Sequence, residues 1–238
     1  MQLAAFVFDY DGTLAHHGQV ADQTLEALRR LKAAGLRLLL VTGRQLPDLQ
    51  RAFPRYDIFD AIVAENGALL AQPALHQERS LGVPPPASLV DALRRRNVEP
   101  LSLGHSIIAT WQPNEAKVLD AIRECGLDWQ IIFNKGAVMC LPPGINKATG
   151  LHAALETLEL SALNALAVGD AENDHAMLAS CGYSAAVANA IDLVKAEVDI
   201  VTQAENGAGV VELIERFLAD PPEGLTPRSR ESSQHRSR

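Results

Sequence analysis

The sequence contains little cysteine, and its few cysteines are widely spaced. Only Cys125, Cys140 and Cys181 occur among the 238 residues, and none of them belongs to a C-x-x-C pair. An odd number of distant cysteines argues against a disulfide framework and against a cysteine-based zinc site. We therefore expect reduced thiols in a cytoplasmic protein.

Long hydrophobic runs are also missing. The apolar run Leu3–Phe8 is short, has no basic flank and continues directly into Asp9. A membrane-spanning helix needs about 20 apolar residues, and a secretory signal needs a basic start and a cleavage site. We expect neither a leader nor a membrane partner.

Positive charge is scarce outside the last residues of the chain. The formal net charge is −8. Residues 221–238 contain four arginines and two glutamates, a net +2, so the rest of the chain carries −10. An acidic body argues against a nucleic-acid partner, because binding to a phosphate backbone draws on clustered cations. A phosphorylated substrate would need local positive groups, such as a metal ion or a lysine.

Two nucleotide-binding motifs are absent as well. No G-x-G-x-x-G follows a predicted strand, and no G-x-x-x-x-G-K-[ST] occurs anywhere. Dinucleotide-binding and P-loop functions therefore have no support. Residues 221–238 are rich in Pro, Ser and Arg and poor in apolar residues, which predicts a disordered tail.

What is present is an alternation of apolar strands and helices. Leu3–Phe8, Leu36–Val41 and Ala61–Ala64 are short apolar runs typical of strands that are buried on both faces. Ala21–Ala34 carries leucines at helical spacing between the first two runs. Strand, helix and strand in this order predict a right-handed βαβ unit. The fold class we expect is α/β, with a parallel, Rossmann-like, doubly wound sheet as the core.

This alternation is interrupted between residues 73 and 142. The segment contains three consecutive prolines at 84–86, helical patterns on either side of a strand, and two runs, Gln130–Asn134 and Ala137–Leu141, that predict a hairpin. We expect a small inserted α+β cap domain at 73–142. The core is then discontinuous, at 1–72 and 143–220. The sequence does not indicate an oligomeric state.

Polar clusters follow three of the predicted core strands. The first is Asp9-Tyr10-Asp11-Gly12-Thr13, the second is Thr42-Gly43-Arg44, and the third runs from Gly169-Asp170 to Asn173-Asp174. Ligands of open parallel sheets bind beyond the carboxyl ends of the strands, so the clusters are expected to meet in one crevice. Carboxylates gathered there need a cation, and hard oxygen ligands suit Mg²⁺.

These motifs, together with Lys147, resemble those of the haloacid dehalogenase-like phosphatases. D-x-D-G-T, a threonine, a lysine and G-D-x-x-N-D occur in the order typical of that family, from about Leu3 to Leu218. The large insertion and the preceding Glu65-Asn66-Gly67-Ala68 are similar to the Cof-type group. The resemblance implies a Mg²⁺-dependent phosphatase in which Asp9 is the nucleophile and Asp11 the general acid/base.

The resemblance also assigns further roles. Thr42 would donate to a phosphate oxygen, and Lys147 would offset the negative charge at the reacting centre. The expected metal ligands are Asp9, Asp11 (through its main-chain carbonyl), Asp170 and Asp174, the last directly or through a water. The expected substrate- or phosphate-binding residues are Gly12, Thr42, Gly43, Arg44, Asn66, Lys147 and Asn173.

Each motif taken alone also has a structural interpretation. D-x-D-G is common in turns. It is not an EF-hand loop, because glycine and Thr13 stand where that loop needs other residues. His16 and His17 are assigned to the surface, and Trp111 and Trp129 to the core of the insertion. Asn134 and Lys135, at the hairpin tip, are candidates for substrate contact, with a plain surface turn as the alternative.

Three functions remain open at this point. The first is a hydrolase acting on a small phosphorylated metabolite, such as a sugar phosphate or a phosphoglycolate-like compound. The second is a phosphotransferase of the same architecture that resembles the phosphomutases. The third is a binding module without activity, against which the intact carboxylate cluster argues, because such a cluster is costly to keep.

Overall fold

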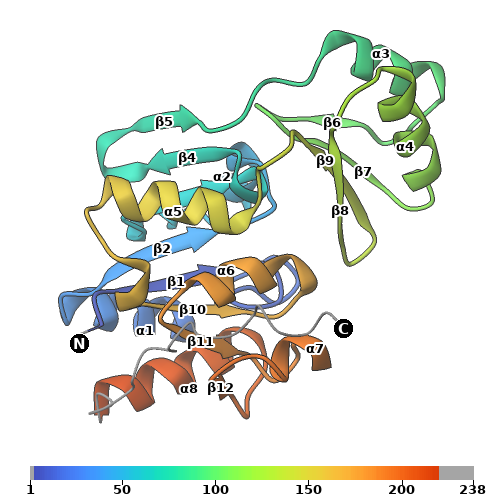
Figure 1. Cartoon of the computed structure of the whole chain (residues 1–238). Helices are drawn as coiled ribbons and strands as arrows, with labels where there is room; N and C mark the ends of the chain where they lie inside the picture. The colour runs from blue at the N-terminus through green and yellow to red at the C-terminus, as the bar shows by residue number, and fades with distance from the viewer. Residues whose placement is uncertain (1–2, 220–238) are drawn as a thin grey trace, which may run out of the picture.

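The structure, a computed structural model, describes residues 3–219, and the predicted tail at 221–238 lies outside them. Its largest element is an eight-stranded sheet in the order β12-β11-β10-β1-β2-β3-β4-β5 (Figure 1). The six strands from β12 to β3 are parallel, and β4 and β5 are added antiparallel at one edge. The strands are β1 (Ala5–Asp9), β2 (Arg37–Val41), β3 (Ala61–Ala64), β4 (Leu69–Gln72), β5 (Gln77–Ser80), β10 (Ala165–Gly169), β11 (Tyr183–Ala186) and β12 (Ile200–Val201).

Helices cover both faces of this sheet. Side chains of β1 alternate between the faces: Phe6 and Phe8 enter one apolar core, and Ala5 and Val7 enter the other. The first core is closed by α1 (Asp22–Ala33), α2 (Leu46–Ala52) and α8 (Asn206–Ala219), and the second by α5 (Lys147–Thr157), α6 (His175–Ser180) and α7 (Asp192–Lys195). The predicted doubly wound α/β core is confirmed.

A second, antiparallel sheet stands beside the core in Figure 1, in the order β6-β7-β9-β8. Helices α3 and α4 pack on it through an apolar cluster that includes Leu89, Leu93, Val118 and Ile122. Residues 87–141 are called the cap below. Its elements are α3 (Ala87–Arg95), β6 (Ser102–Leu103), β7 (Ile108–Trp111), α4 (Glu115–Glu124), β8 (Gln130–Asn134) and β9 (Ala137–Leu141).

The start of the insertion differs from the expected residue 73. Gln77–Ser80 forms β5, which pairs with β4 at the edge of the core sheet. All four residues of β5 are exposed, so this strand carries no apolar pattern by which sequence reasoning would assign it to the core. The third polar cluster ends in a single 3₁₀ turn, η5 (Glu172–Asp174), which leads directly into α6.

Among residues 3–219, no helix combines the length and the hydropathy that crossing a bilayer requires.

Candidate active site

The loops that follow β1, β2 and β10 meet at one edge of the core sheet. β1 lies between β2 and β10, in parallel register with both, so that Asp9 pairs with Val41 and Phe8 with Val168. Thr42 follows Val41 directly, and Asp170 lies two residues after Val168. Each of them begins a polar loop. The predicted convergence of the three sequence clusters is thus a direct result of strand order.

Three buried carboxylates form the centre of this edge. Asp9, Asp170 and Asp174 each offer an oxygen within 4.8 Å of the other two. Lys147, the first residue of α5, is also buried, and its Nζ donates to Oδ1 of Asp9 and to Oδ1 of Asp174, both at 2.6 Å. One ammonium group therefore bridges two of the three acids.

The pKa values of Asp9 and Lys147 are both raised, for different reasons. Burial, and then the neighbouring Asp174, raise the pKa of Asp9 well above its ordinary value, although Lys147 lowers it in part. Burial alone would lower the pKa of Lys147, but the charges of Asp174 and Asp9 outweigh it, so that its pKa is raised. Lys147 is therefore held charged beside the acids.

Asp174 shapes the loop that carries Asp170. Its Oδ2 accepts hydrogen bonds from the backbone N–H groups of Asp170 at 2.9 Å and Ala171 at 3.0 Å. Because Lys147 takes Oδ1, both oxygens of Asp174 are engaged. Thr13 donates to Oδ1 of Asp170 at 2.9 Å and orients it. Sequence reasoning gave Thr13 no role, although its place in the first motif was the available signal.

The side chain of Asp11 turns away from the buried acids. Arg44 grips it through two parallel hydrogen bonds, Nε to Oδ2 at 2.7 Å and Nη2 to Oδ1 at 2.8 Å. Arg44 also pairs with Asp48 at 2.8 Å and lies 5.2 Å from the ring centroid of Tyr10. The two functions expected of Asp11 are therefore separated: its carboxylate lies with Arg44, and its main-chain carbonyl faces Asp170.

A cation from the cap occupies the space between that carbonyl and Asp170. The Nζ of Lys135 lies 3.0 Å from the main-chain oxygen of Asp11 and 2.7 Å from Oδ2 of Asp170. A Cβ at Gly12 would lie 2.1 Å from this nitrogen and 2.5 Å from Oδ2 of Asp170. Residues other than glycine are thus excluded at position 12 for two reasons: the backbone has a positive φ of +94°, and a Cβ would clash with its neighbours.

These contacts also test whether the site fits a divalent ion. The donors are a carboxylate and a main-chain carbonyl, with the Asp9 carboxylate close to Asp170, and they already hold a positively charged group. Oxygen donors of this kind are those that Mg²⁺ prefers. The residues present therefore fit the metal that the sequence predicts.

The second cluster forms a network with the residues before the cap. Thr42 is buried; its Oγ1 accepts from the backbone of Arg44, and its main-chain oxygen accepts from that of Asn66. Asn66 adopts a left-handed conformation, and its Oδ1 accepts from Asn173 at 3.1 Å. A Cβ at Gly43 would lie 3.2 Å from the Asn66 amide. Five of the seven residues predicted to bind substrate or phosphate thus lie in one network: Thr42, Gly43, Arg44, Asn66 and Asn173.

A cavity of about 520 Å³ lies between this edge and the cap. Asp9, Asp11 and Arg44 line it from the core, and Trp111, Asn134 and Lys135 from the cap. Trp111 is 54% exposed, so its assignment to the core of the insertion is wrong, whereas Trp129 is buried there as expected. The alternation of β7 explains the difference, because Thr110 is the buried neighbour of Trp111.

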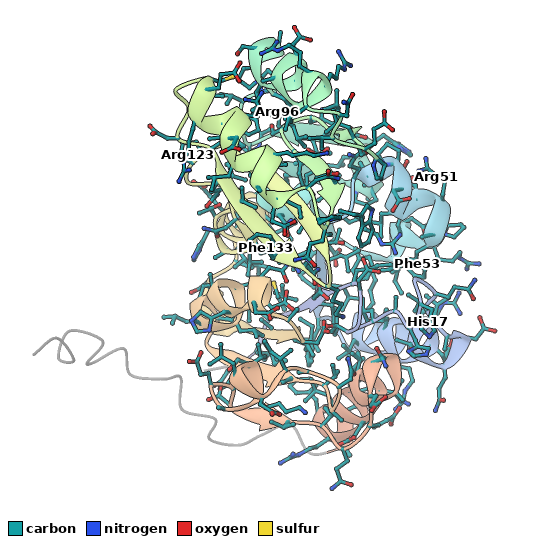
Figure 2. All side chains as sticks on the ribbon, turned by 90° about the vertical axis from the view of Figure 1, so that its right-hand side faces the viewer. His17, Arg51, Phe53, Arg96, Arg123 and Phe133 are labelled. Atoms are coloured by element: carbon teal, nitrogen blue, oxygen red, sulfur yellow. The ribbon has the colours of Figure 1, made fainter. Side chains whose placement is uncertain are left out.

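Glu65 connects core and cap, a role that sequence reasoning missed. Its buried carboxylate accepts backbone hydrogen bonds from His105 and Ser106 at 2.9 Å and from Ile107 at 3.2 Å. His16 and His17 are exposed, as expected, and Figure 2 shows His17 at the surface of the core.

The chain is similar to known proteins along most of its length. Residues 6–103 and 115–214 match the family model of haloacid dehalogenase-like hydrolases. A phosphoglycolate phosphatase of Methanothermobacter thermautotrophicus is 29% identical over 225 residues, which cover 91% of this chain and 99% of the relative. A phosphoglycolate phosphatase of Methanosarcina acetivorans is 29% identical over 220 residues, covering 90% and 96%.

Solved structures show the same fold. A haloacid dehalogenase-like hydrolase from Bacteroides thetaiotaomicron superposes with a TM-score of 0.76 at 22% identity, covering 91% of this chain and all of that one. A sugar phosphatase of HAD subclass IIB superposes with a TM-score of 0.72 at 19% identity, covering 90% and 98%. At these identities the likeness shows the fold alone.

Proposed function

The chain belongs to the haloacid dehalogenase-like hydrolases, of the Cof-type group, and from this premise we propose that it is a Mg²⁺-dependent phosphatase with Asp9 as its nucleophile. The observation that carries the proposal is the buried arrangement of Asp9, Asp170 and Asp174 around the Lys147 ammonium. A carboxylate attacks a phosphoryl group only where positive charge shields both anions. The Lys147 ammonium supplies part of this charge, and the three carboxylates provide oxygen ligands for a cation that would supply the rest.

Asp9, the main-chain carbonyl of Asp11 and Asp170 would hold Mg²⁺, and Asp174 would keep the Asp170 loop in place. When bound, the ion supplies Lewis-acid shielding of the phosphoryl oxygens. Thr13 orients Asp170 for this purpose through its 2.9 Å hydrogen bond. Gly12 leaves the space open, because it has no Cβ.

In the first step, an oxygen of Asp9 forms a bond to phosphorus and the bond to the ester oxygen breaks. The departing alkoxide takes a proton from Asp11, which general acid catalysis requires to be within hydrogen-bond reach. Both oxygens of the ionised Asp11 accept from Arg44; as the proton donor, Asp11 carries its hydrogen on one oxygen and turns it to the ester oxygen, while the other oxygen keeps its bond to Arg44. Lys147 stays against Asp9 and offsets the charge that develops.

In the second step, Asp11 takes a proton from water as the water oxygen bonds to phosphorus. The bond between phosphorus and the Asp9 oxygen breaks, which releases inorganic phosphate and restores the carboxylate. Phosphoryl oxygens would be held by the Thr42 hydroxyl and by the amide of Asn173. The amide nitrogen of Asn173 already donates one hydrogen to Asn66 and has a second one to offer to a phosphoryl oxygen.

The partner we propose is a small phosphorylated metabolite, phosphoglycolate-like or a sugar phosphate. Curated relatives that span nearly the whole chain bear the name phosphoglycolate phosphatase, and the cavity of about 520 Å³ suits a small molecule. Cys125 and Cys140 are free thiols, which supports a cytoplasmic location.

The test is turnover of 2-phosphoglycolate and a panel of sugar phosphates, with Mg²⁺, in water enriched in ¹⁸O. A phosphatase places one ¹⁸O in each released phosphate, and added chelator stops the release. Isomerised sugar phosphate without labelled phosphate would instead establish the phosphomutase alternative. Turnover that is indifferent to chelator would contradict the metal assignment.

A further inference from the structure

Lys135 is the cap residue that enters the acidic edge of the core. It stands at the tip of the β8–β9 hairpin, which in Figure 1 extends from the cap toward the core loops and lies beside η5. Its ammonium group contacts the main-chain oxygen of Asp11 and Oδ2 of Asp170. These are two of the oxygens assigned above to Mg²⁺, so the lysine stands where the metal is expected.

The backbone at the hairpin tip shows that this position is specifically held. Asn134 pairs with Ala137, which leaves a two-residue loop of Lys135 and Gly136 with φ values of +48° and +87°. Loops of this kind favour Asn-Gly or Asp-Gly, because a long side chain pays a steric cost at positive φ. A lysine in that conformation is a strained choice, and strain of this kind concentrates at functional sites.

We propose that the Lys135 ammonium and Mg²⁺ compete for these two oxygens, so that metal binding releases the cap hairpin from the core. The inference rests on the proposed function, since it requires a Mg²⁺ site. Mg²⁺ binds oxygen at about 2.0–2.1 Å, and the lysine nitrogen lies 2.7 Å and 3.0 Å from the same atoms. Two cations cannot share them.

The release concerns the hairpin and leaves the rest of the cap attached. Glu65 still receives the backbone N–H groups of residues 105–107, and Gln45 still donates to Ser102 at 2.9 Å. These contacts lie on the β6–β7 side, whereas Lys135 lies at the far end of β8. The tip of the hairpin can therefore move, while the Glu65 contacts and the contact of Asn66 with Met139 of β9 hold the rest of the cap on the core.

A displaced Lys135 gains a second role once substrate arrives. With Mg²⁺ bound and no anion present, like charges repel the ammonium from the site. A phosphorylated substrate replaces this repulsion by attraction, since its anionic oxygens attract both the ammonium group and Mg²⁺. The lysine then closes the hairpin over the cavity that Trp111 and Asn134 also line. Lys135 thus couples closure of the cap to the presence of both metal and substrate.

The first experiment measures Mg²⁺ affinity by calorimetry for the wild type, Lys135→Met and Lys117→Met. Lys117 is the matched control, because it is an exposed cap lysine that bonds only a cap carbonyl, that of Asn97. Lys135 is 53% exposed, and a pair of this exposure corresponds to about a two- to fivefold change in an equilibrium. We expect Lys135→Met to bind Mg²⁺ about two- to fivefold more tightly, with the control unchanged.

The second experiment follows the lysine itself. Amine acylation at constant pH and ionic strength, read by mass spectrometry, gives the modification rates of Lys135 and Lys117 in the same wild-type sample. Mg²⁺ should accelerate modification of Lys135 alone, and Mg²⁺ with inorganic phosphate should slow it again.

The outcomes separate this inference from the proposed function. The competition would be overturned if wild type and Lys135→Met bound Mg²⁺ with equal, measurable affinity. It would also be overturned if saturating Mg²⁺ did not change the acylation rate of Lys135. Neither result would contradict the metal site itself. Absence of Mg²⁺ binding by every variant would overturn the metal site and the competition together. Tighter binding by Lys135→Met with Mg²⁺-dependent acylation of Lys135 would establish it.

Discussion

Arg44 holds the carboxylate of Asp11 by two parallel hydrogen bonds of 2.7 Å and 2.8 Å, across 33 residues of sequence. This fork geometry is available to arginine and not to lysine. It places the acid/base carboxylate outside the buried group of Asp9, Asp170 and Asp174. Two aspartates that are two residues apart thus have different surroundings, which is what different roles in one reaction require.

Replacing Arg44 by lysine should therefore slow the reaction although the charge is kept. A misplaced acid/base group can cost up to about 10² in rate, and we expect Arg44→Lys to lower kcat by about ten- to a hundredfold. Arg29→Lys is the control, since Arg29 is exposed, pairs with Glu26 and does not line the cavity. Steady-state kinetics of the wild type and both variants give the three values of kcat. If kcat of Arg44→Lys equalled that of the control, the fork would have no part in catalysis.

Replacing Asp11 by asparagine should affect substrates according to their leaving groups. General acid catalysis is worth about 10² to 10⁴ in rate, but an aryl phosphate needs little protonation to depart. We expect the first turnover of Asp11→Asn to fall far more for an alkyl than for an aryl phosphate. Rapid-quench measurement of the first turnover avoids interference from slow dephosphorylation. An equal fall for both would make Asp11 a structural residue.

Replacing Lys147 by methionine should destabilise the fold as well as remove activity. The change leaves Asp9 and Asp174 buried without their shared cation, and breaking a buried pair on one side costs about 3–5 kcal/mol. Denaturant unfolding of the metal-free protein measures the loss in the free energy of unfolding. Lys195→Met serves as the control, because Lys195 is partly exposed. Unchanged stability would mean that the acids do not depend on Lys147.

Replacing Glu65 by glutamine should loosen the attachment of the cap at one turn. The carboxylate receives three backbone hydrogen bonds, and hydrogen bonds to charged groups contribute about 1.5–3 kcal/mol. We expect faster amide hydrogen exchange at residues 105–107 in Glu65→Gln, and no change there in the exposed control Glu78→Gln. Equal exchange in the two variants would show that this connection does not hold the cap.

The sequence was sufficient to predict the core of the fold because the residues of its central strands are mostly apolar. Ala61–Ala64 was predicted with the bounds that the structure shows, and so were the hairpin strands Gln130–Asn134 and Ala137–Leu141. The edge strand Gln77–Ser80 was missed because all of its residues are exposed. A strand buried on neither face leaves no hydrophobic signal.

The site could be predicted as far as its motifs extend. Asp9, Asp170 and Lys147 follow strand ends or begin a helix, and parallel pairing brings such positions together. The contacts of Glu65 with residues 105–107 and of Lys135 with Asp170 join segments 35 or more residues apart. They depend on how the cap sits over the core, and no local pattern encodes that placement.

The identity of the nucleophile is the central claim, and direct chemical trapping tests it. In Asp11→Asn, an aryl phosphate can still phosphorylate Asp9, while water activation is lost, so the acyl phosphate should accumulate. Borohydride reduction after a rapid quench converts a phosphorylated aspartate to homoserine, which peptide mass spectrometry locates. We predict homoserine at position 9 and at no other aspartate. Homoserine at another position, or its absence while labelled phosphate is released, would contradict the account.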